Sequence, residues 1–227
     1  MKKVLVFAAH PDDELLGLGA TVRRMSDEGV EMRAVIMAEG ITSRSDKRMD
    51  TDKSELQELQ EDARKAAEII GYRSIEFCNF PDNRMDGMEL LDVIKMISRY
   101  VEKYKPDTIF THHHGDLNID HRITNEAVLT ACRPVGCCTV KRVFAFETPS
   151  STEWNYNYSE PFTPNVYYNV ADTIESKIKG MECYRTERTE YPHPRSAEAL
   201  RCLARLRGSS AGYEMAEAFV LLREYVD

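Results

Sequence analysis

The sequence lacks any apolar run of the roughly 20 residues that a membrane-spanning helix needs. We therefore predict a protein without a membrane span. Lys2 and Lys3, followed by apolar residues 4–9, imitate a secretory signal, but the apolar stretch is too short and acidic residues follow at once. A first β-strand explains this segment better, so we expect a cytoplasmic protein.

Cysteine is sparse, and positive charge is not in excess. The 227 residues include six cysteines and no CxxC pair, which argues against a disulfide scaffold, a thiolate zinc site and a thioredoxin-type motif. We expect reduced, mostly buried thiols. The net charge of −8 is the opposite of the basic face that nucleic-acid binders show. This balance favours a small-molecule substrate over DNA or RNA.

Strand-sized apolar runs alternate with segments of helical periodicity along the first two thirds of the chain. Strands are predicted at 4–8, 32–37, 74–78, 108–111, 143–146 and 166–170, and helices at 15–28, 53–70, 89–104 and 119–131. Residues 42–52 are predicted as a surface loop, and the tail from Asp172 as mainly helical. This alternation predicts an α/β fold with a mostly parallel sheet, helices on both faces and a helical C-terminal part. Without repeats or a clear linker, residues 1–227 are predicted to form one domain.

The loop after the first predicted strand reads His10-Pro11-Asp12-Asp13-Glu14. Ligands of open parallel sheets bind at the carboxyl ends of the strands, where this loop falls. Carboxylates crowded together raise one another's pKa, and a divalent cation removes that cost. His10 and Asp13 are expected to face one point, with Asp12 directed elsewhere and Glu14 orienting a ligand. The alternative is the N-terminus of a helix that carries acidic residues, an arrangement that is common and stabilising.

The loop after the fourth predicted strand concentrates histidine. Four of the chain's six histidines lie between residues 112 and 121. His121 opens a predicted helix, and Asp120 is expected to accept the second N–H of His121 or of another ligand. Two histidines and one aspartate leave an open position, as in a catalytic zinc site. For His112, His113 and His114 a packed ring, a substrate hydrogen bond and a solvated loop stay open.

These motifs resemble the LmbE-like, or PIG-L, family of zinc-dependent N-deacetylases. The resemblance rests on AAHPDDE at residues 8–14 and IDH at 119–121. Further matching pieces are Gly40 with Ser43-Arg44, FPDNR at 80–84, YPHPRS at 191–196 and AEAF at 216–219. The tail pieces resemble a bacterial branch associated with surface-carbohydrate synthesis.

The resemblance implies a Rossmann-like three-layer sandwich that hydrolyses the amide of an N-acetylglucosamine-type sugar. It also implies Zn²⁺ held by His10, Asp13 and His121, with Asp12 as general base. Asn118 stands where many members carry an oxyanion-stabilising histidine, so a hydrogen bond from Asn118, a loop histidine or His193 is expected in its place. Leu59 stands where many members carry a substrate-binding arginine.

The predicted site therefore has three groups of residues. The metal ligands are His10, Asp13 and His121; the catalytic residues are Asp12, Asn118, Asp120 and His193; the substrate contacts are Arg44, Asp82, Arg84 and His113. A solvated turn is an equal alternative for Asp82 and Arg84. Other interpretations are a metal hydrolase of another amide, an ester or a phosphoester, and a non-catalytic metal- or sugar-binding protein. Iron, manganese and a homo-oligomer are also compatible with the sequence.

Overall fold

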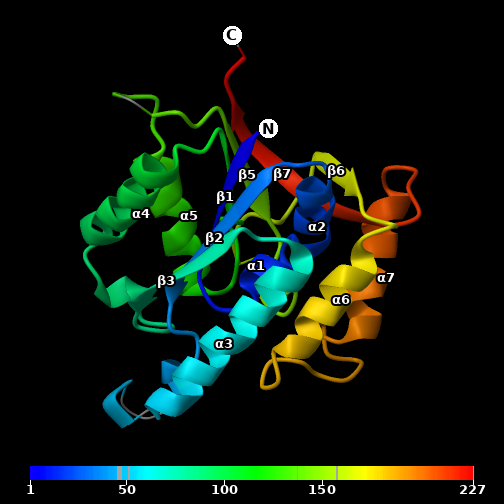
Figure 1. Ribbon diagram of the computed structural model, residues 1–227, viewed down its shortest axis with the longest axis horizontal. Coiled ribbons are helices and arrows are strands. Elements are labelled where there is room, and N and C mark those ends of the chain that lie inside the picture. The colour runs from blue at the N-terminus through cyan, green and yellow to red at the C-terminus, as the bar shows by residue number, and fades with distance from the viewer. Residues whose placement is uncertain (45–47, 51, 137, 157, 227) are drawn as a thin grey trace.

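The computed structural model describes residues 1–44, 48–50, 52–136, 138–156 and 158–226. Within these ranges, seven strands form one sheet in the order β3-β2-β1-β4-β5-β7-β6 (Figure 1). β1 pairs in parallel with β2 and β4, and only β7 runs against its neighbours β5 and β6. The strands are β1 Lys3–Ala8, β2 Glu31–Ala38, β3 Ser74–Phe80, β4 Thr108–His112, β5 Arg142–Phe146, β6 Val166–Asn169 and β7 Ala216–Glu224.

Helices cover both faces of this sheet, which makes three layers. Figure 1 shows α4 and α5 on one face and α2, α3, α6 and α7 on the other. The helices are α1 Asp13–Leu16, α2 Gly19–Asp27, α3 Lys53–Ile70, α4 Leu90–Tyr104, α5 Ile119–Ala131, α6 Ile174–Cys183 and α7 Ala197–Ser209. Short 3₁₀ turns are η1 Thr42–Arg44, η2 Arg48–Asp50, η3 Met85–Gly87 and η4 Thr152–Asn155. The predicted α/β three-layer fold with a mostly parallel sheet is confirmed.

The central strand β1 shows why the sheet needs two layers of helices. Val4 and Val6 belong to the apolar core under α2, α3 and α6, whereas Leu5 and Phe7 belong to the core under α4 and α5. Side chains alternate between the faces of a strand, so a strand that is apolar throughout must be covered on both sides. The buried β1 therefore ends in a fixed position, and the His10 loop begins there.

The predicted helix 15–28 is interrupted in the structure between α1 and α2. Gly17 lies against the Phe146 ring, where a Cβ atom would come within 2.3 Å of a ring carbon. Glu217 of β7 accepts hydrogen bonds from the N–H groups of Ala20 and Thr21, which open α2. These contacts come from distant strands, so local periodicity did not reveal the break.

The tail is helical in α6 and α7, as predicted, but it ends in a strand. β7 lies antiparallel between β5 and β6, and its Phe219 packs edge-on against Phe110, with ring centroids 5.0 Å apart. The apolar run of this segment is compatible with helix and strand, and pairing in the sheet decides between them. In the predicted loop 42–52, Thr42 is buried in η1, while residues 45–47 and 51 lie outside the described residues.

No helix in the described part of the chain has both the length and the apolar character to span a membrane.

Candidate metal centre

A cleft of about 190 Å³ opens beside the carboxyl ends of β1 and β4. β1 pairs with β2, the next strand in the chain, on one side and with β4 on its other side. The chain connections therefore lead away from β1 in opposite directions. Such switch points are where open α/β sheets bind ligands. The residues lining the cleft are His10, Pro11, Asp12, Asp13, Gly40, Ser43, Arg44, Asp82, Asn83, Asn118, His121, Ser150, Ser151, Glu187 and Arg195.

Three donor groups converge in this cleft: His10 from the loop after β1, Asp13 from the start of α1 and His121 from the first turn of α5. Oδ2 of Asp13 lies 3.4 Å from Nδ1 of His10 and 3.2 Å from Nε2 of His121. Ligand atoms about 2.0 Å from a tetrahedral zinc lie about 3.3 Å from one another. Among the described residues, these three form one of two groups with the spacing of metal ligands. Their donor types and spacing therefore fit a divalent cation.

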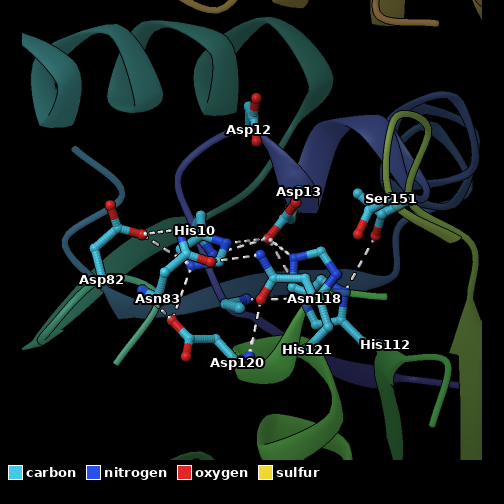
Figure 2. Close-up of polar contacts among 12 residues, drawn as sticks. His10, Asp12, Asp13, Asp82, Asn83, His112, Asn118, Asp120, His121 and Ser151 are labelled. Atoms are coloured by element: carbon cyan, nitrogen blue, oxygen red, sulfur yellow. Dashed lines mark hydrogen bonds and ion pairs between the residues drawn. The ribbon is translucent and has the colours of Figure 1, made fainter. Parts of the chain in front are cut away.

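Carboxylates hold the far nitrogen of each histidine. Nε2 of His10 lies 3.0 Å from Asp120 (Figure 2). Nδ1 of His121 lies 3.1 Å from Asp116. An imidazole that directs one N–H to a carboxylate presents its other nitrogen as a ligand. Asp120 is thus the carboxylate partner of His10, which is one of the two possibilities that the sequence left open. Asp116 is the carboxylate partner of His121.

Both of these carboxylates are themselves fixed by hydrogen bonds. Asp120 accepts the backbone N–H groups of Asn83, at 2.7 Å, and Met85, at 3.0 Å. Asp116 accepts the hydroxyls of Ser151 and Thr152. Backbone and side-chain hydrogen bonds therefore hold the outer partners of the two histidines in place.

A second group with metal-ligand spacing consists of His10, Asp82 and Asp120. It uses Nε2 of His10, which lies 3.2 Å from Asp82 and 3.0 Å from Asp120. An N–H of His10 directed at both carboxylates accounts for this arrangement, since Asp82 also accepts the hydroxyl and backbone N–H of Ser43. We interpret this group as the support of His10 and not as a second cation site.

The electrostatics of the cluster also favour a cation. Burial lowers the pKa of His121, but the carboxylates of Asp13 and Asp116 outweigh it and raise the pKa to about 9. Burial raises the pKa of the Asp13 carboxyl, but His121 and His112 hold it well below its usual range. The surroundings thus favour positive charge at this point, and a bound metal would replace protons there.

Asp12 lies beside the donor group and not within it, as the sequence predicted (Figure 2). Its backbone has a φ of 107°, an unusual conformation for a residue with a side chain, and its N–H donates to the buried Glu14. Strained backbone of this kind concentrates at functional sites. Burial raises the pKa of the Asp12 carboxyl well above its usual value, although Arg195 acts in the opposite direction.

Arg195 is the principal site residue that sequence reasoning missed. Its Nη1 lies 2.8 Å from Oδ2 of Asp12 and 2.9 Å from Oε2 of Glu187, and its Nε donates to Ser150. Glu187 also accepts a hydrogen bond from Arg44. The only signal in the sequence was the YPHPRS piece at 191–196, which contains Arg195 but does not reveal its partner.

Three predicted polar residues line the cleft. They are Arg44, Asp82 and Asn118. Asn118 caps α5 by accepting the N–H of Asp120 at 2.8 Å, and its amide group donates to Asn83 at 2.8 Å. Its amide is thus already engaged as a donor.

Three other predicted residues are not brought to the cleft. Nε2 of His113 bonds to the carbonyl of Glu160, and the ring is buried against Phe162. His193 accepts the backbone N–H of Arg195 and packs edge-on against Trp154. Arg84 is exposed and is not among the lining residues. Which way three consecutive histidines point depends on where β4 ends, which the sequence did not fix closely enough.

His112 has a structural position beside the donors. Its Nε2 accepts the backbone N–H of Ala9 at 2.8 Å, and its Nδ1 lies 3.1 Å from the hydroxyl of Thr148. The ring also stacks on His121, with centroids 3.8 Å apart. His112 therefore joins the ends of β1 and β4 and supports the ring of a candidate ligand.

The fold and the cleft define an α/β protein with a candidate centre for a divalent cation at the switch point of its sheet. The family model of PIG-L, described as GlcNAc-PI de-N-acetylase, matches residues 5–132. The chain belongs to the PIG-L (LmbE-like) family, and it is a hydrolytic enzyme of the N-deacetylase type. The resemblance inferred from the sequence is confirmed.

Similar proteins agree with the family assignment. The chain is 30% identical to the uncharacterized deacetylase YaiS of Escherichia coli K12, over 75% of this chain and 83% of YaiS. It is 24% identical to the diacetylchitobiose deacetylase of Thermococcus kodakarensis, over 96% of this chain and 82% of that protein.

The conserved protein TT1542 of Thermus thermophilus superposes with a TM-score of 0.79 at 21% identity, over 100% and 97% of the two chains. GalB, a 4-carboxy-2-hydroxymuconate hydratase of Pseudomonas putida, reaches 0.77 at 21% identity, over 100% and 98%. Because GalB catalyses another reaction, the shared fold alone does not specify the chemistry.

Proposed function

We propose that residues 1–227 act as one zinc-dependent domain that removes the N-acetyl group from an N-acetylglucosamine-type sugar or sugar conjugate. The observation that carries this proposal is the convergence of His10, Asp13 and His121, with Asp12 beside them in one cleft. The name of the Thermococcus relative, a diacetylchitobiose deacetylase, supports an acetamido sugar as substrate.

His10 through Nδ1, Asp13 through Oδ2 and His121 through Nε2 would hold the metal. Three protein ligands leave a position open, which is the pattern of catalytic rather than structural zinc. When bound, the cation would lower the pKa of a coordinated water to about 7 and polarise the acetyl carbonyl. Two imidazoles with one carboxylate suit zinc, and iron and manganese are the alternatives to test.

Asp12 is proposed as the general base. It takes a proton from the attacking water as the new C–O bond forms, and the proton passes to the sugar nitrogen as the C–N bond breaks. The Arg195 guanidinium keeps the Asp12 carboxylate in place at 2.8 Å. General acid–base catalysis of this kind contributes about 10²–10⁴-fold to the rate.

The remaining roles follow from position. Asn118, which lines the cleft, is proposed to donate a hydrogen bond to the developing oxyanion, after its amide turns from Asn83. Asp120 orients His10 and does not itself contact the reacting atoms. Asp82 and Arg44 are proposed to contact sugar hydroxyls. A cytoplasmic location and a role in glycoconjugate synthesis complete the proposal.

Acetate release by the zinc-loaded protein from a panel of N-acetylated sugars tests this function. The panel contains free, nucleotide-linked and lipid-linked acetamido sugars, and the Asp12→Asn variant is the control. Release by wild type, with at least about a hundredfold loss in the variant, is expected. No release from any member by protein that holds one equivalent of zinc would contradict the proposal and favour another amide or an ester.

A further inference from the structure

The positively charged guanidinium groups in the cleft already form ion pairs with carboxylates. Among the described lining residues the only arginines are Arg44 and Arg195, and both contact Glu187. Arg195 also contacts Asp12 at 2.8 Å. Glu187 is 9% exposed, so it lies between the two guanidinium groups with little access to water.

Carboxylates outnumber guanidinium groups among the described residues of the wall. Four carboxylates, those of Asp12, Asp13, Asp82 and Glu187, line the cleft beside two guanidinium groups. A divalent cation held by the candidate ligands would bring the summed charge of these carboxylates and guanidinium groups to zero. It would not make that charge positive. The side chains of the wall therefore offer no spare positive charge to an anionic ligand.

Apart from the candidate ligands His10 and His121, the other polar groups of the described wall are neutral. Ser43, Asn83, Asn118, Ser150 and Ser151 supply hydroxyls and amides, which donate and accept hydrogen bonds in the way that sugar hydroxyls require. Building on the proposed function, we propose that the substrate is an uncharged saccharide. The part of it that enters the cleft carries no phosphate and no carboxylate.

An anionic substrate would meet a specific obstacle. To bind Arg44 or Arg195 it must displace Glu187, and this would leave a buried carboxylate without its partner. Such unpaired buried charge is strongly unfavourable. Arg84 is exposed next to the lining residue Asn83, but it lies outside the wall and is open to screening by salt.

The test compares three derivatives of N-acetylglucosamine with different substituents at C1: an uncharged second N-acetylglucosamine, an anionic phosphate and an anionic malate. The zinc-loaded enzyme is expected to favour the uncharged disaccharide in kcat/KM by about tenfold or more, the size of one charge-assisted contact. Higher kcat/KM for the phosphate or the malate would overturn the inference.

Equilibrium binding separates this inference from the proposed function. Calorimetry with chelator-treated protein measures the binding of the same three compounds without hydrolysis, with Arg44, Arg195 and Glu187 unchanged. Tighter binding of the disaccharide supports the inference even if no acetate is released. Tighter binding of either anion contradicts it, whichever reaction the enzyme catalyses.

The Glu187→Gln variant tests the proposed cause. Removing this carboxylate takes one counter-charge from Arg44 and Arg195, although Arg195 keeps its contact with Asp12, so the binding ratio of anionic to neutral compound should rise about tenfold. Glu190→Gln removes the same charge from an exposed position of the same segment and should leave the ratio unchanged. Thermal unfolding curves check that both variants are folded. Equal ratios in the two folded variants would refute the role of Glu187.

Discussion

Nδ1 of His121 lies 3.1 Å from Oδ1 of Asp116, and this contact turns Nε2 of the same ring toward Asp13. Asp116 is fully buried and also accepts the hydroxyls of Ser151 and Thr152. Its pKa is depressed well below the usual range, because His121 and these hydrogen bonds outweigh burial. Asp116 is therefore an ionised support for a candidate metal ligand.

Replacing Asp116 by Asn is expected to weaken zinc binding by about 10–100-fold, the usual effect of losing an outer partner of a ligand. An amide oxygen still accepts a hydrogen bond, but it carries no charge to stabilise the ring. Competition with a chromophoric chelator measures the affinity. The exposed Asp86→Asn change is the control, and equal affinities in the two variants would contradict the assigned role.

Lys177 and Glu217 form a buried ion pair that is expected to be essential for stability. Nζ of Lys177 lies 2.6 Å from Glu217 and 2.6 Å from the carbonyl of Leu16, at the break between α1 and α2. Lys177→Met leaves Glu217 buried and unpaired, so the free energy of unfolding should fall by about 3–5 kcal/mol. Urea unfolding measures this change.

An exposed pair provides the matched control. Arg201 and Glu175 are 2.7 Å apart on the surface, and Arg201→Met should cost less than about 1 kcal/mol. Similar losses in the Lys177 and Arg201 variants would show that the buried pair has no special role.

Asp107 gives a pH-dependent contribution to stability away from the cleft. Its carboxylate accepts the N–H groups of Lys2, at 2.7 Å, and Lys3, at 3.1 Å, and so ties the start of β1 to β4. Burial raises its pKa, but the hydrogen bonds from Thr108, Lys2 and Lys3 outweigh it and lower the pKa. The contribution is therefore complete above the unfolded pKa of about 3.9 and is lost as the pH falls through the folded value.

Asp107→Asn should then cost about 1 kcal/mol at pH 7, and this cost should shrink as the pH falls from about 3.9 through the folded pKa, where the wild-type carboxyl becomes protonated as well. Unfolding free energies of both proteins across this pH range measure the difference. A constant difference across this range would exclude a role for the charge.

Thiol reactivity is expected to separate the described cysteines. The five described cysteines are free, but only Cys132 is buried, so the prediction of mostly buried thiols was wrong. Burial nevertheless raises the pKa of Cys78 and Cys132 to about 12, while Cys202 is exposed. In a native protein at pH 8, a thiol reagent should modify Cys202 within minutes and Cys78 and Cys132 only after unfolding. Fast labelling of Cys132 would contradict this account.

Local signals in the sequence were sufficient for several elements. α3 and α5 have the predicted bounds, because Asp52 and Asn118 cap their first turns and Gly71 ends α3 with a φ of 92°. β7 and the break before Gly19 were not predicted, since they depend on Phe110, Phe146 and Glu217, which are distant in sequence.

The candidate site followed the same division. His10, Asp13 and His121 could be grouped because each lies on the connection that follows a predicted parallel strand, and the starts of such connections meet at one edge of the sheet. Arg195 could not be paired with Asp12, 183 residues away, because the chain between α6 and α7 follows no periodicity that predicts its path. The ligand roles themselves remain predictions.

Zinc content of three purified proteins tests the proposed centre most directly. Wild type and Asp12→Asn are expected to hold one equivalent of zinc each, because Asp12 lies outside the donor group, whereas His121→Ala should hold almost none. Mass-spectrometric metal analysis after dialysis, on proteins shown by circular dichroism to be folded, measures this. Full zinc in His121→Ala, or loss of zinc in Asp12→Asn, would contradict the assignment of ligands and base.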